Sequence, residues 1–258
     1  MKQPAAQVGQ HSRREIVGRT RGRFDSEAVK SRPDFDVMPE LVNGDYAAMW
    51  SGGKDSALAV ARARANGCRI DRLVTFYDPA TGRVRFHETP ISLLAAQAKA
   101  AGAELDARPT AWLDMGVEFG RLLDDLCAAG YEGVVFGDIH LADVRAWYEE
   151  RVLAAGLRHV EPIWGEAPVD LLDEYVRAGG RAVVSCCDTE RLEAGWLGRV
   201  TDETFLGDLA GLGIDACGEN GEYHTFAFAG PPLAQTVAWR PGNRESDGRF
   251  ERLLLEPG

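Results

Sequence analysis

The hexapeptide Ser51-Gly52-Gly53-Lys54-Asp55-Ser56 decides the fold. Before it, residues 45–50 (DYAAMW) are typical of a short buried strand, and after it, residues 57–66, rich in Ala, Leu and Arg, are typical of a helix. Two glycines let the backbone approach an anion closely. The N–H groups and the dipole at the start of the helix then attract a phosphate. The hexapeptide therefore predicts a phosphate-binding loop between a strand and a helix.

The side chains of this loop also suit a nucleotide phosphate. Ser51 and Ser56 carry hydroxyls, Lys54 carries a positive charge, and Asp55 can cap the helix or help to hold Mg²⁺. Two other nucleotide motifs do not match. Walker A requires glycine where Ala48 stands and Ser or Thr at position 55, and no G-x-G-x-x-G occurs in the chain. A glycine turn followed by a capped helix is the alternative interpretation.

Short apolar segments alternate with helical stretches that end at glycine. We expect strands at residues 45–50, 71–77 and 133–136, and helices at 57–66, 92–101, 117–129 and 141–155. This alternation predicts βαβ units and a parallel sheet. Ligands bind beyond the carboxyl ends of such strands, which is where the hexapeptide, Asp78 and Asp138 fall.

The regular alternation of short apolar segments and helical stretches ends at about residue 165. We expect helices at 171–178 and 201–212, strands at 181–185 and 225–229, and an antiparallel pair at 235–239 and 249–255. The chain is therefore predicted to consist of a mobile polar tail (residues 1–40), a nucleotide-binding α/β domain (41–165) and a smaller C-terminal α/β domain on the substrate side (166–258).

Composition and charge narrow the class of protein. The chain has 258 residues, 45% of them hydrophobic, so it can bury a large core without disulfides. Its 29 Lys and Arg against 40 Asp and Glu give a net charge of −11, which argues against a large nucleic-acid interface. Eight of the basic and six of the acidic residues lie in the first 40, so this tail carries +2 and the remainder −13.

The same sequence favours a cytoplasmic protein. No apolar stretch approaches the roughly 18 residues of a membrane helix, and the N-terminus lacks the apolar core of a signal peptide. The five cysteines are odd in number and form no C-x-x-C, as expected of a reduced compartment.

Three further segments, taken together with the hexapeptide, resemble the motifs of a known family. The first is Phe86-His87 with Gln97-Ala98. The second is Gly137-Asp138-Ile139, followed by Arg145, Glu149, Gly156-Leu157 and Pro162-Ile163-Trp164. The third is GENGEYHTF, residues 218–226. The hexapeptide resembles the S-G-G-x-D-S loop of the PP-loop ATP pyrophosphatases. Together the segments, from about residue 45 to residue 233, resemble the diphthine–ammonia ligase (diphthamide synthase) family.

The resemblance implies a fold and a reaction. The fold would be a parallel-sheet PP-loop domain, of the adenine nucleotide alpha hydrolase-like class, with a smaller C-terminal α/β domain. The reaction would be the ATP-dependent amidation of a carboxylate by ammonia, through an acyl-adenylate, with release of AMP and pyrophosphate. The implied ligands are ATP, Mg²⁺, ammonia and a carboxylate-bearing acceptor, which is a small molecule or a protein side chain; neither nucleic acid nor a membrane is implied.

The resemblance also implies site residues, position by position. ATP would be held by Ser51, Gly52, Gly53, Lys54, Asp55, Ser56 and Asp138, with Asp55 also a ligand of the metal ion. Catalysis would involve Lys54, Asp55, Glu219 and Glu222. The acceptor side would include Arg145, Glu149, Arg199, Asn220 and His224. The sequence departs from the family pattern at two of these positions, because the family leads us to expect Gly at 220 and Glu at 224. Both departures lie on the acceptor side, so the acceptor stays open.

Several of these residues could have a structural role in place of a role in the site. Asp138 could cap the next helix, Arg145 and Glu149 could form an i, i+4 ion pair, and Arg199 could be a surface arginine. Glu219 and Glu222 either hold a cation or act as a general base, or they belong to a plain polar turn whose spacing matches no zinc signature.

Two other functions are compatible with the loop. One is a non-catalytic adenine-nucleotide-binding protein. The other is a tRNA-modifying PP-loop enzyme, which the acidic body and the lack of suitably spaced cysteines disfavour. The chain begins Met1-Lys2-Gln3 without the initial cysteine of a glutaminase, so we expect ammonia to come from solution or from a partner.

Overall fold

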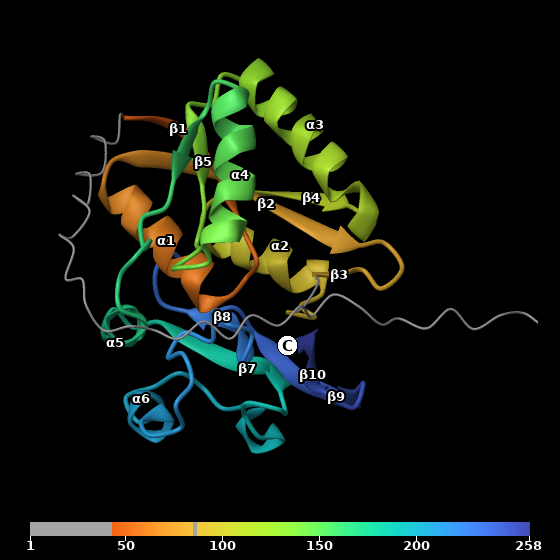
Figure 1. The fold of residues 1–258 in the computed structure, drawn as a ribbon, viewed down its shortest axis with the longest axis vertical. Coiled ribbons are helices and arrows are strands. Elements are labelled where there is room, and N and C mark those ends of the chain that lie inside the picture. The colour runs from red at the N-terminus through yellow and green to blue at the C-terminus, as the bar shows by residue number, and fades with distance from the viewer. Residues whose placement is uncertain (1–42, 85–86) are drawn as a thin grey trace, which may run out of the picture. The chain divides into compact units, whose positions relative to one another are not determined.

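The central parallel sheet is organised around β1 (Gly44–Met49), as the computed structural model shows (Figure 1). Its other strands are β2 (Cys68–Asp78), β3 (Arg83–Val84), β4 (Glu104–Pro109), β5 (Gly133–Val135) and β6 (Arg158–Val160). β1 pairs in parallel with β2 on one side and β5 on the other. β4 extends the sheet beside β2 and β6 beside β5, both in parallel, and β3 adds a short antiparallel pair at the end of β2. The strand order therefore reverses at β1, where α/β sheets form their ligand crevice.

The structure describes residues 43–84 and 87–258, all within one unit of the chain. The tail predicted for residues 1–40 and the motif residue Phe86 lie outside the described residues. Within the described ranges, no helix combines the length and apolar character needed to cross a bilayer.

Four helices cover the two faces of the sheet: α1 (Lys54–Ala65), α2 (Ile91–Ala100), α3 (Met115–Ala128) and α4 (Ala142–Ala154). Side chains alternate along β1, so Tyr46 and Ala48 pack with α1 and α2, while Ala47 packs with Phe119 of α3 and Val152 of α4. The sheet is thus enclosed between two helical layers.

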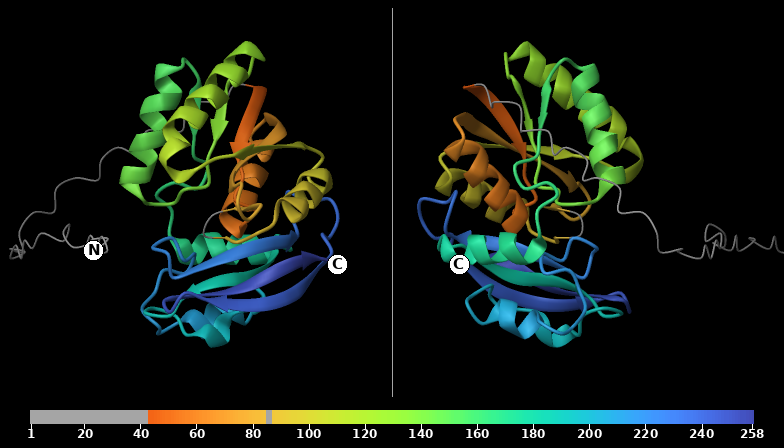
Figure 2. Two further views of the ribbon diagram at one scale, coloured as in Figure 1. Left: turned by 90° about the vertical axis from the view of Figure 1, so that its right-hand side faces the viewer. Right: turned by 60° about the vertical axis from the view of Figure 1, so that its left-hand side comes forward.

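A second sheet follows α5 (Pro168–Arg177). It contains β7 (Arg181–Asp188), β8 (Tyr223–Ala229), β9 (Trp239–Ser246) and β10 (Phe250–Pro257), antiparallel in the order β8-β7-β10-β9 (Figure 2). The remaining elements are the short helix α6 (Phe205–Leu209) and two single 3₁₀ turns, η1 (Trp112–Asp114) and η2 (Ala194–Trp196). The predicted fold class, a parallel-sheet PP-loop domain with a smaller C-terminal α/β domain, is confirmed. The boundary placed at residue 165 stays a prediction.

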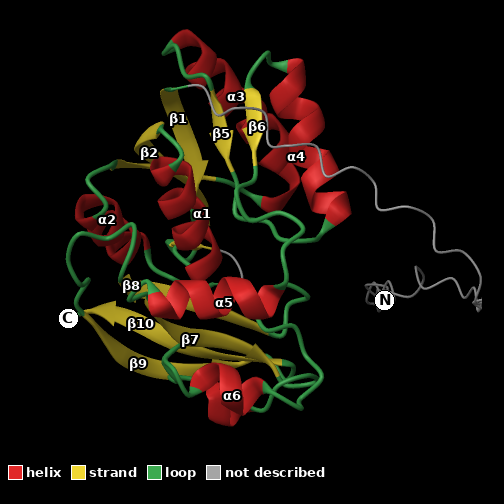
Figure 3. Cartoon of the chain, turned by 90° about the vertical axis from the view of Figure 1, so that its left-hand side faces the viewer, coloured by secondary structure: helices red, strands yellow, loops and turns green. Residues whose placement is uncertain are grey.

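The two sheets share one hydrophobic core, in which residues of α1 and α2 pack with Phe226 and Ala227 of β8. Helix α5 lies between α1 and the second sheet (Figure 3). Arg62 of α1 donates to the carbonyl oxygen of Pro162 at 3.0 Å and to the carboxylate of Glu174 on α5 at 2.9 Å. The shared core thus packs β8 against α1 and α2, and Arg62, in the last turn of α1, ties this helix to α5.

Several predicted elements differ from the observed ones. The helix predicted at 201–212 is shortened to α6, because Gly207 and Gly211 weaken it and residues 202–204 form a turn in which Asp202 Oδ1 accepts the N–H groups of Thr204 and Phe205. The strand predicted at 235–239 was placed too early: β9 begins at Trp239 and is a polar edge strand containing Pro241, which has no apolar alternation to reveal it. Strands β4 and β6 were missed because they are short and polar.

Candidate active site

A cavity of about 460 Å³ lies at the carboxyl ends of β1, β2 and β5. Its polar lining includes Ser51, Lys54, Asp55, Ser56, His87, Asp138, Glu219, His224 and Thr225, and its apolar wall includes Met49, Val74, Phe76, Met115, Phe136, Val144 and Tyr148. The cavity therefore combines an apolar compartment with a strongly polar end, as sites for amphipathic ligands such as nucleotides do.

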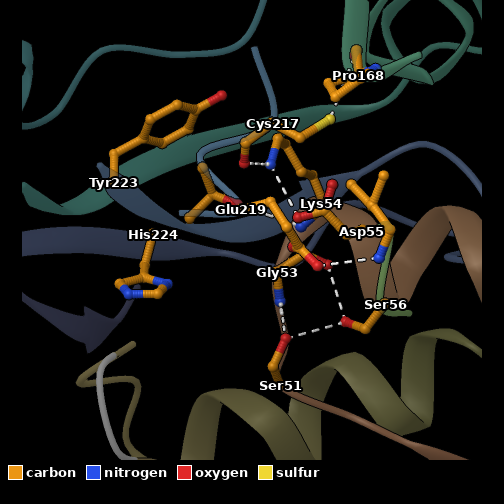
Figure 4. Close-up of polar contacts among 12 residues, drawn as sticks. Ser51, Gly53, Lys54, Asp55, Ser56, Pro168, Cys217, Glu219, Tyr223 and His224 are labelled. Carbon is orange, nitrogen blue, oxygen red and sulfur yellow. Dashed lines mark hydrogen bonds and ion pairs between the residues drawn. The ribbon is translucent and has the colours of Figure 1, made fainter. Parts of the chain in front are cut away.

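The predicted phosphate loop leads directly from β1 into α1 (Figure 4). Gly52 has φ +81°, a left-handed conformation that favours glycine, and a Cβ there would lie 2.8 Å from the Oε1 of Gln97. Ser51 Oγ accepts the N–H of Gly53 at 3.2 Å, and Ser56 Oγ donates to the carbonyl of Gly53 at 3.0 Å. The loop is thus pre-shaped at the start of α1, the place where an anion site is expected.

Buried groups hold this loop from behind. Gln97, which is fully buried, accepts the indole N–H of Trp50 through Oε1 at 2.9 Å. Its Nε2 donates to the carbonyls of Gly52 at 2.9 Å and of Ala227 at 2.6 Å. The N–H of Ala227 also donates to Gly52, at 2.8 Å, and the N–H of Lys54 donates to Thr225 Oγ1 at 3.2 Å. Strand β8 and helix α2 therefore fix the conformation of the loop together.

Lys54 is not a free cation pointing at a phosphate. Its side chain is 3% exposed. Its Nζ lies 2.8 Å from Asp55 Oδ2, donates to the carbonyl of Cys217 and lies 5.1 Å from the ring centre of Tyr223. Burial works to lower the pKa of Lys54, but the attraction of Asp55 prevails and raises it well above the ordinary value. Lys54 therefore stays charged, but Asp55 already compensates its charge, and it ties the loop to the Cys217–Glu219 segment.

Two carboxylates face the cavity from different parts of the chain. Glu219 accepts the N–H of Ile139 through Oε1 at 2.9 Å, which brings it beside Asp138 at the end of β5. Burial raises the pKa of Glu219 to about 7, assisted by the negative charges of Asp55 and Asp138 and opposed by the Ile139 N–H. Burial likewise raises the pKa of Asp138 to about 6. Near neutral pH this pair can give up or take up a proton, which is the property of a general base.

The residues around the loop fit a magnesium ion that arrives with a nucleotide. The described residues contain no group of three or more His, Cys, Asp or Glu that could hold a metal ion alone. Magnesium ions in nucleotide sites are commonly held by one or two carboxylates together with phosphate oxygens. Asp55 and Asp138 line the cavity next to the loop and would be those carboxylates, since hard oxygen donors suit Mg²⁺.

Of the predicted acceptor-side residues, only His224 lines the cavity. Its ring centre lies 4.7 Å from that of His87, on the segment before α2. Asn220 points to Glu222, with Nδ2 3.5 Å from Oε1. Glu222 itself is 2% exposed and forms an ion pair with Arg191 at 3.3 Å. The glycine-flanked turn is present, but of its two glutamates only Glu219 lines the cavity. The catalytic role predicted for Glu222 stays a prediction, and the position of this side chain does not support it.

The structure does not bring the predicted arginines to the cavity. Arg145 pairs with Glu149 at 3.4 Å, the intrahelical pair expected from their spacing, and also with Glu161 at 3.1 Å. Arg199 stacks on Trp196, 4.2 Å from the ring centre, and pairs with Asp208. Both arginines are engaged in local contacts, and neither is among the described residues that line the cavity.

Sequence reasoning missed three contributions to the site. Gln97 and Thr225 give no signal of their roles beyond their motif segments, because their partners are distant in sequence. Cys217 lines the cavity, and its thiol donates to the carbonyl of Pro168 at 3.3 Å. Burial raises the pKa of the Cys217 thiol, so it stays protonated and inert. This counts against a sulfur-transfer reaction at this cavity.

A buried acid next to the site predicts a pH-dependent stability. Burial raises the pKa of Glu161 to about 8, despite Arg145. In the unfolded chain the acid ionises near pH 4.5, so between pH 4.5 and 8 the folded state holds a proton that the unfolded state has lost, and stability falls as the pH rises. Glu161→Gln removes this penalty. Relative to the parent chain, the variant should gain about 2–4 kcal/mol of unfolding free energy between pH 5 and pH 8.

Urea unfolding at the two pH values measures this difference. Glu150→Gln, which changes an exposed acid on α4, is the matched control and should show no such gain. An equal response of the two variants would show that Glu161 is ionised in the folded protein. His159, whose pKa burial lowers to about 4, lies 3.6 Å from Glu161, so its response to pH is measured together with that of Glu161.

Two protein-family models match the chain. The model described as the diphthamide synthase N-terminal domain matches residues 44–159, and the model described as the diphthamide synthase C-terminal domain matches residues 167–245. A search of curated proteins found no match. The first model covers the phosphate loop and strands β1 to β5, and the second covers β7, β8 and the Glu219 turn. The chain therefore belongs to the diphthamide synthase family.

Proposed function

We propose that this protein is an ATP-dependent ligase that adenylates a carboxylate and amidates it with ammonia, releasing AMP and pyrophosphate. The diphthamide synthase domains place it among ATP-utilising PP-loop ligases. One observation above all supports amidation: the phosphate loop, Asp138 and Glu219 line the same cavity. An adenylating and amidating enzyme needs a site for the phosphates and, beside it, a base for the incoming nitrogen.

The first step is expected at the phosphate loop. An oxygen of the acceptor carboxylate attacks the α-phosphorus of ATP, the bond from that phosphorus to the bridging oxygen breaks, and pyrophosphate leaves. The N–H groups at the start of α1 and the hydroxyls of Ser51 and Ser56 hold the phosphates, and their fixed positions reduce the cost of orienting them. When Mg²⁺ is bound with the nucleotide, it neutralises part of the phosphate charge.

The second step is expected at the carboxylate pair. The nitrogen of ammonia forms a bond to the acyl carbon, the bond from that carbon to the phosphate oxygen breaks, and AMP leaves. Ionised Glu219, whose Oε1 is held by Ile139, accepts a proton from the nitrogen, and Asp138 keeps the region attractive to ammonium. The apolar wall of the cavity is suited to the adenine ring and keeps water away from the reactive acyl group.

Nucleotide binding tests the location of the site. Replacing both Lys54 and Asp55 with alanine removes the anchor between the loop and Cys217, together with the carboxylate beside the phosphates. We expect the affinity for Mg·ATP to fall by about 10- to 100-fold, the usual cost of losing charged hydrogen bonds. Calorimetry or equilibrium dialysis measures it, with the exposed pair Lys99→Ala and Asp124→Ala as control. Unchanged affinity in the Lys54 and Asp55 variant would reject this location.

Product analysis tests the reaction. With ATP, Mg²⁺, ammonium and a suitable acceptor, AMP and pyrophosphate should form in equal amounts, and the acceptor should gain an amide. Tight nucleotide binding without pyrophosphate release across a broad set of carboxylates would instead favour a nucleotide-binding protein without turnover. Salt-sensitive binding of tRNA would favour a tRNA-modifying enzyme.

A further inference from the structure

The cavity lacks an uncompensated positive charge for the triphosphate it is proposed to bind. Lys54 is the one lysine or arginine among the described residues that line it, and Asp55 already compensates that charge. Asp138 and Glu219 add further acids to the lining. A triphosphate brings several negative charges to this end of the cavity. Charge must therefore be supplied by the metal ion, by backbone N–H groups or by side chains that can become cationic.

Two histidine rings lie beside the phosphate loop and can become cationic. His87 and His224 both line the cavity, and their ring centres are 4.7 Å apart. A Cβ added to Gly53 would lie 3.1 Å from Cε1 of His87, so this ring packs directly against the second glycine of the phosphate loop. Phosphates held by that loop are thus neighbours of the imidazole pair.

The second sheet fixes the backbone of both histidines. Ser185 of β7 is fully buried, and its hydroxyl lies 3.2 Å from the carbonyl oxygen of His87 and 3.4 Å from that of His224. The next residue, Glu88, has φ +53°, a strained conformation for a residue with a side chain, and its carboxylate lies 3.5 Å from Arg252 of β10. A segment held in this way against strain indicates that the position of His87 matters for function.

The tautomer of His87 follows from its hydrogen bond. Nδ1 lies 3.3 Å from the carbonyl oxygen of Thr225, and since a carbonyl only accepts, Nδ1 carries the hydrogen. In the neutral ring Nε2 is then the atom that can take up a proton. Burial lowers the pKa of His87, and it lowers that of His224 well below the ordinary value, assisted by the charge of Lys54 and by the neighbouring ring. Both rings are therefore neutral at pH 7 before a nucleotide binds.

We propose that His87 and His224 form the cationic part of the triphosphate site, as neutral rings that take up a proton when the β- and γ-phosphates bind beside them. The inference rests on the proposed ATP-binding function. The charged and titratable groups that face the pair are Lys54 and Asp55 from the start of α1, with Asp138 and Glu219 across the same cavity. Of these, Lys54 disfavours protonation of both rings and Asp55 favours that of His87, so the incoming phosphates decide the balance.

Calorimetry in buffers of different ionisation enthalpy measures the proton uptake. At pH 7.5 with saturating Mg²⁺, the full chain should take up about one proton per ATP bound, and distinctly less with AMP, which has no β- or γ-phosphate. The affinity for Mg·ATP should fall as the pH rises, by up to about tenfold per pH unit. His87→Asn with His224→Asn should lose most of the uptake and weaken ATP binding, because asparagine keeps a donor near the position of Nδ1 but cannot be protonated.

Two controls separate the pair from other groups. His140→Asn changes a histidine outside the cavity lining, paired with Asp215, and should retain the uptake. Asp138→Asn tests whether the uptake belongs to the carboxylates. Proton uptake that persists without the two histidines, or that disappears in Asp138→Asn although this variant still binds Mg·ATP, would overturn the inference. Binding of Mg·ATP by the wild type without proton uptake would reject the pair but leave the proposed function standing, whereas no binding at all would reject both.

Nuclear magnetic resonance gives a readout that does not depend on the double variant folding. The chain has five histidines, so their ring resonances can be resolved and assigned with single variants. Mg·ATP should move the His87 or His224 resonance to the imidazolium position. Ring resonances that stay at neutral positions at saturating nucleotide would contradict the proposal.

Discussion

Replacing Glu219 with glutamine is expected to lower the rate of amide formation by about 100-fold or more, while ATP binding changes by less than about threefold. Glutamine can still accept the Ile139 N–H through its Oε1, so the turn stays in place. It cannot accept a proton from the attacking nitrogen. The loss should therefore appear in kcat of the complete reaction and not in nucleotide affinity.

The pH profile gives this prediction its second readout. Burial, together with Asp55 and Asp138, raises the pKa of Glu219 to about 7. A base must be ionised to work, so the wild-type rate is expected to fall as the pH decreases through about 7, and Glu219→Gln should lack this dependence. Glu203→Gln, which alters an exposed acid paired with Arg181, is the control. A Glu219→Gln variant with the wild-type rate and profile would remove Glu219 from the mechanism.

The second large effect concerns stability. Gln97→Leu should lower the free energy of unfolding by about 2–6 kcal/mol, because two buried groups, the indole N–H of Trp50 and the carbonyl of Ala227, lose their hydrogen-bond partner at about 1–3 kcal/mol each. The carbonyl of Gly52 keeps the N–H of Ala227. Urea unfolding measures the loss, and ATP affinity should fall with it because Gly52 belongs to the phosphate loop.

A glutamine elsewhere provides the matched control. Gln235→Leu makes the same chemical change at an exposed position and should stay within about 0.5 kcal/mol of the wild type. Gln97→Glu keeps an acceptor for Trp50 but removes the two N–H donors, so it should also be strongly destabilised. Equal stabilities of Gln97→Leu and Gln235→Leu would show that these buried bonds do not hold the loop.

The sequence was informative where the determinants are local. The strand–loop–helix unit around residues 51–56 was predicted because glycines, a helix start and an apolar segment occur together within about 20 residues. Gln97 gave no such signal, since its three partners are 45, 47 and 130 positions away. Short strands such as β4 and β6 escaped because pairing with neighbours, and not their own composition, makes them strands.

The turn that contains Glu219 and Glu222 also shows that the sequence does not distinguish residues whose positions depend on distant contacts. Glu219 and Glu222 are chemically identical and three positions apart, so the pattern predicted one role for both. In the structure the carbonyl of Glu222 pairs with the N–H of Asp188 at 2.9 Å, at the edge of the second sheet, and its side chain turns to Arg191. Glu219 stays in the loop and reaches Ile139. The difference arises from strand pairing with a segment more than 30 residues earlier.

The contact between β8 and Gly52 has a consequence for how the protein is made. The phosphate loop is translated early, but Thr225 and Ala227, which fix its conformation, leave the ribosome about 170 residues later. A nascent or truncated chain that ends before β8 therefore carries the complete hexapeptide without its working conformation. We expect such fragments to be unable to engage ATP, so that adenylating capacity arises only in chains whose synthesis has passed β8.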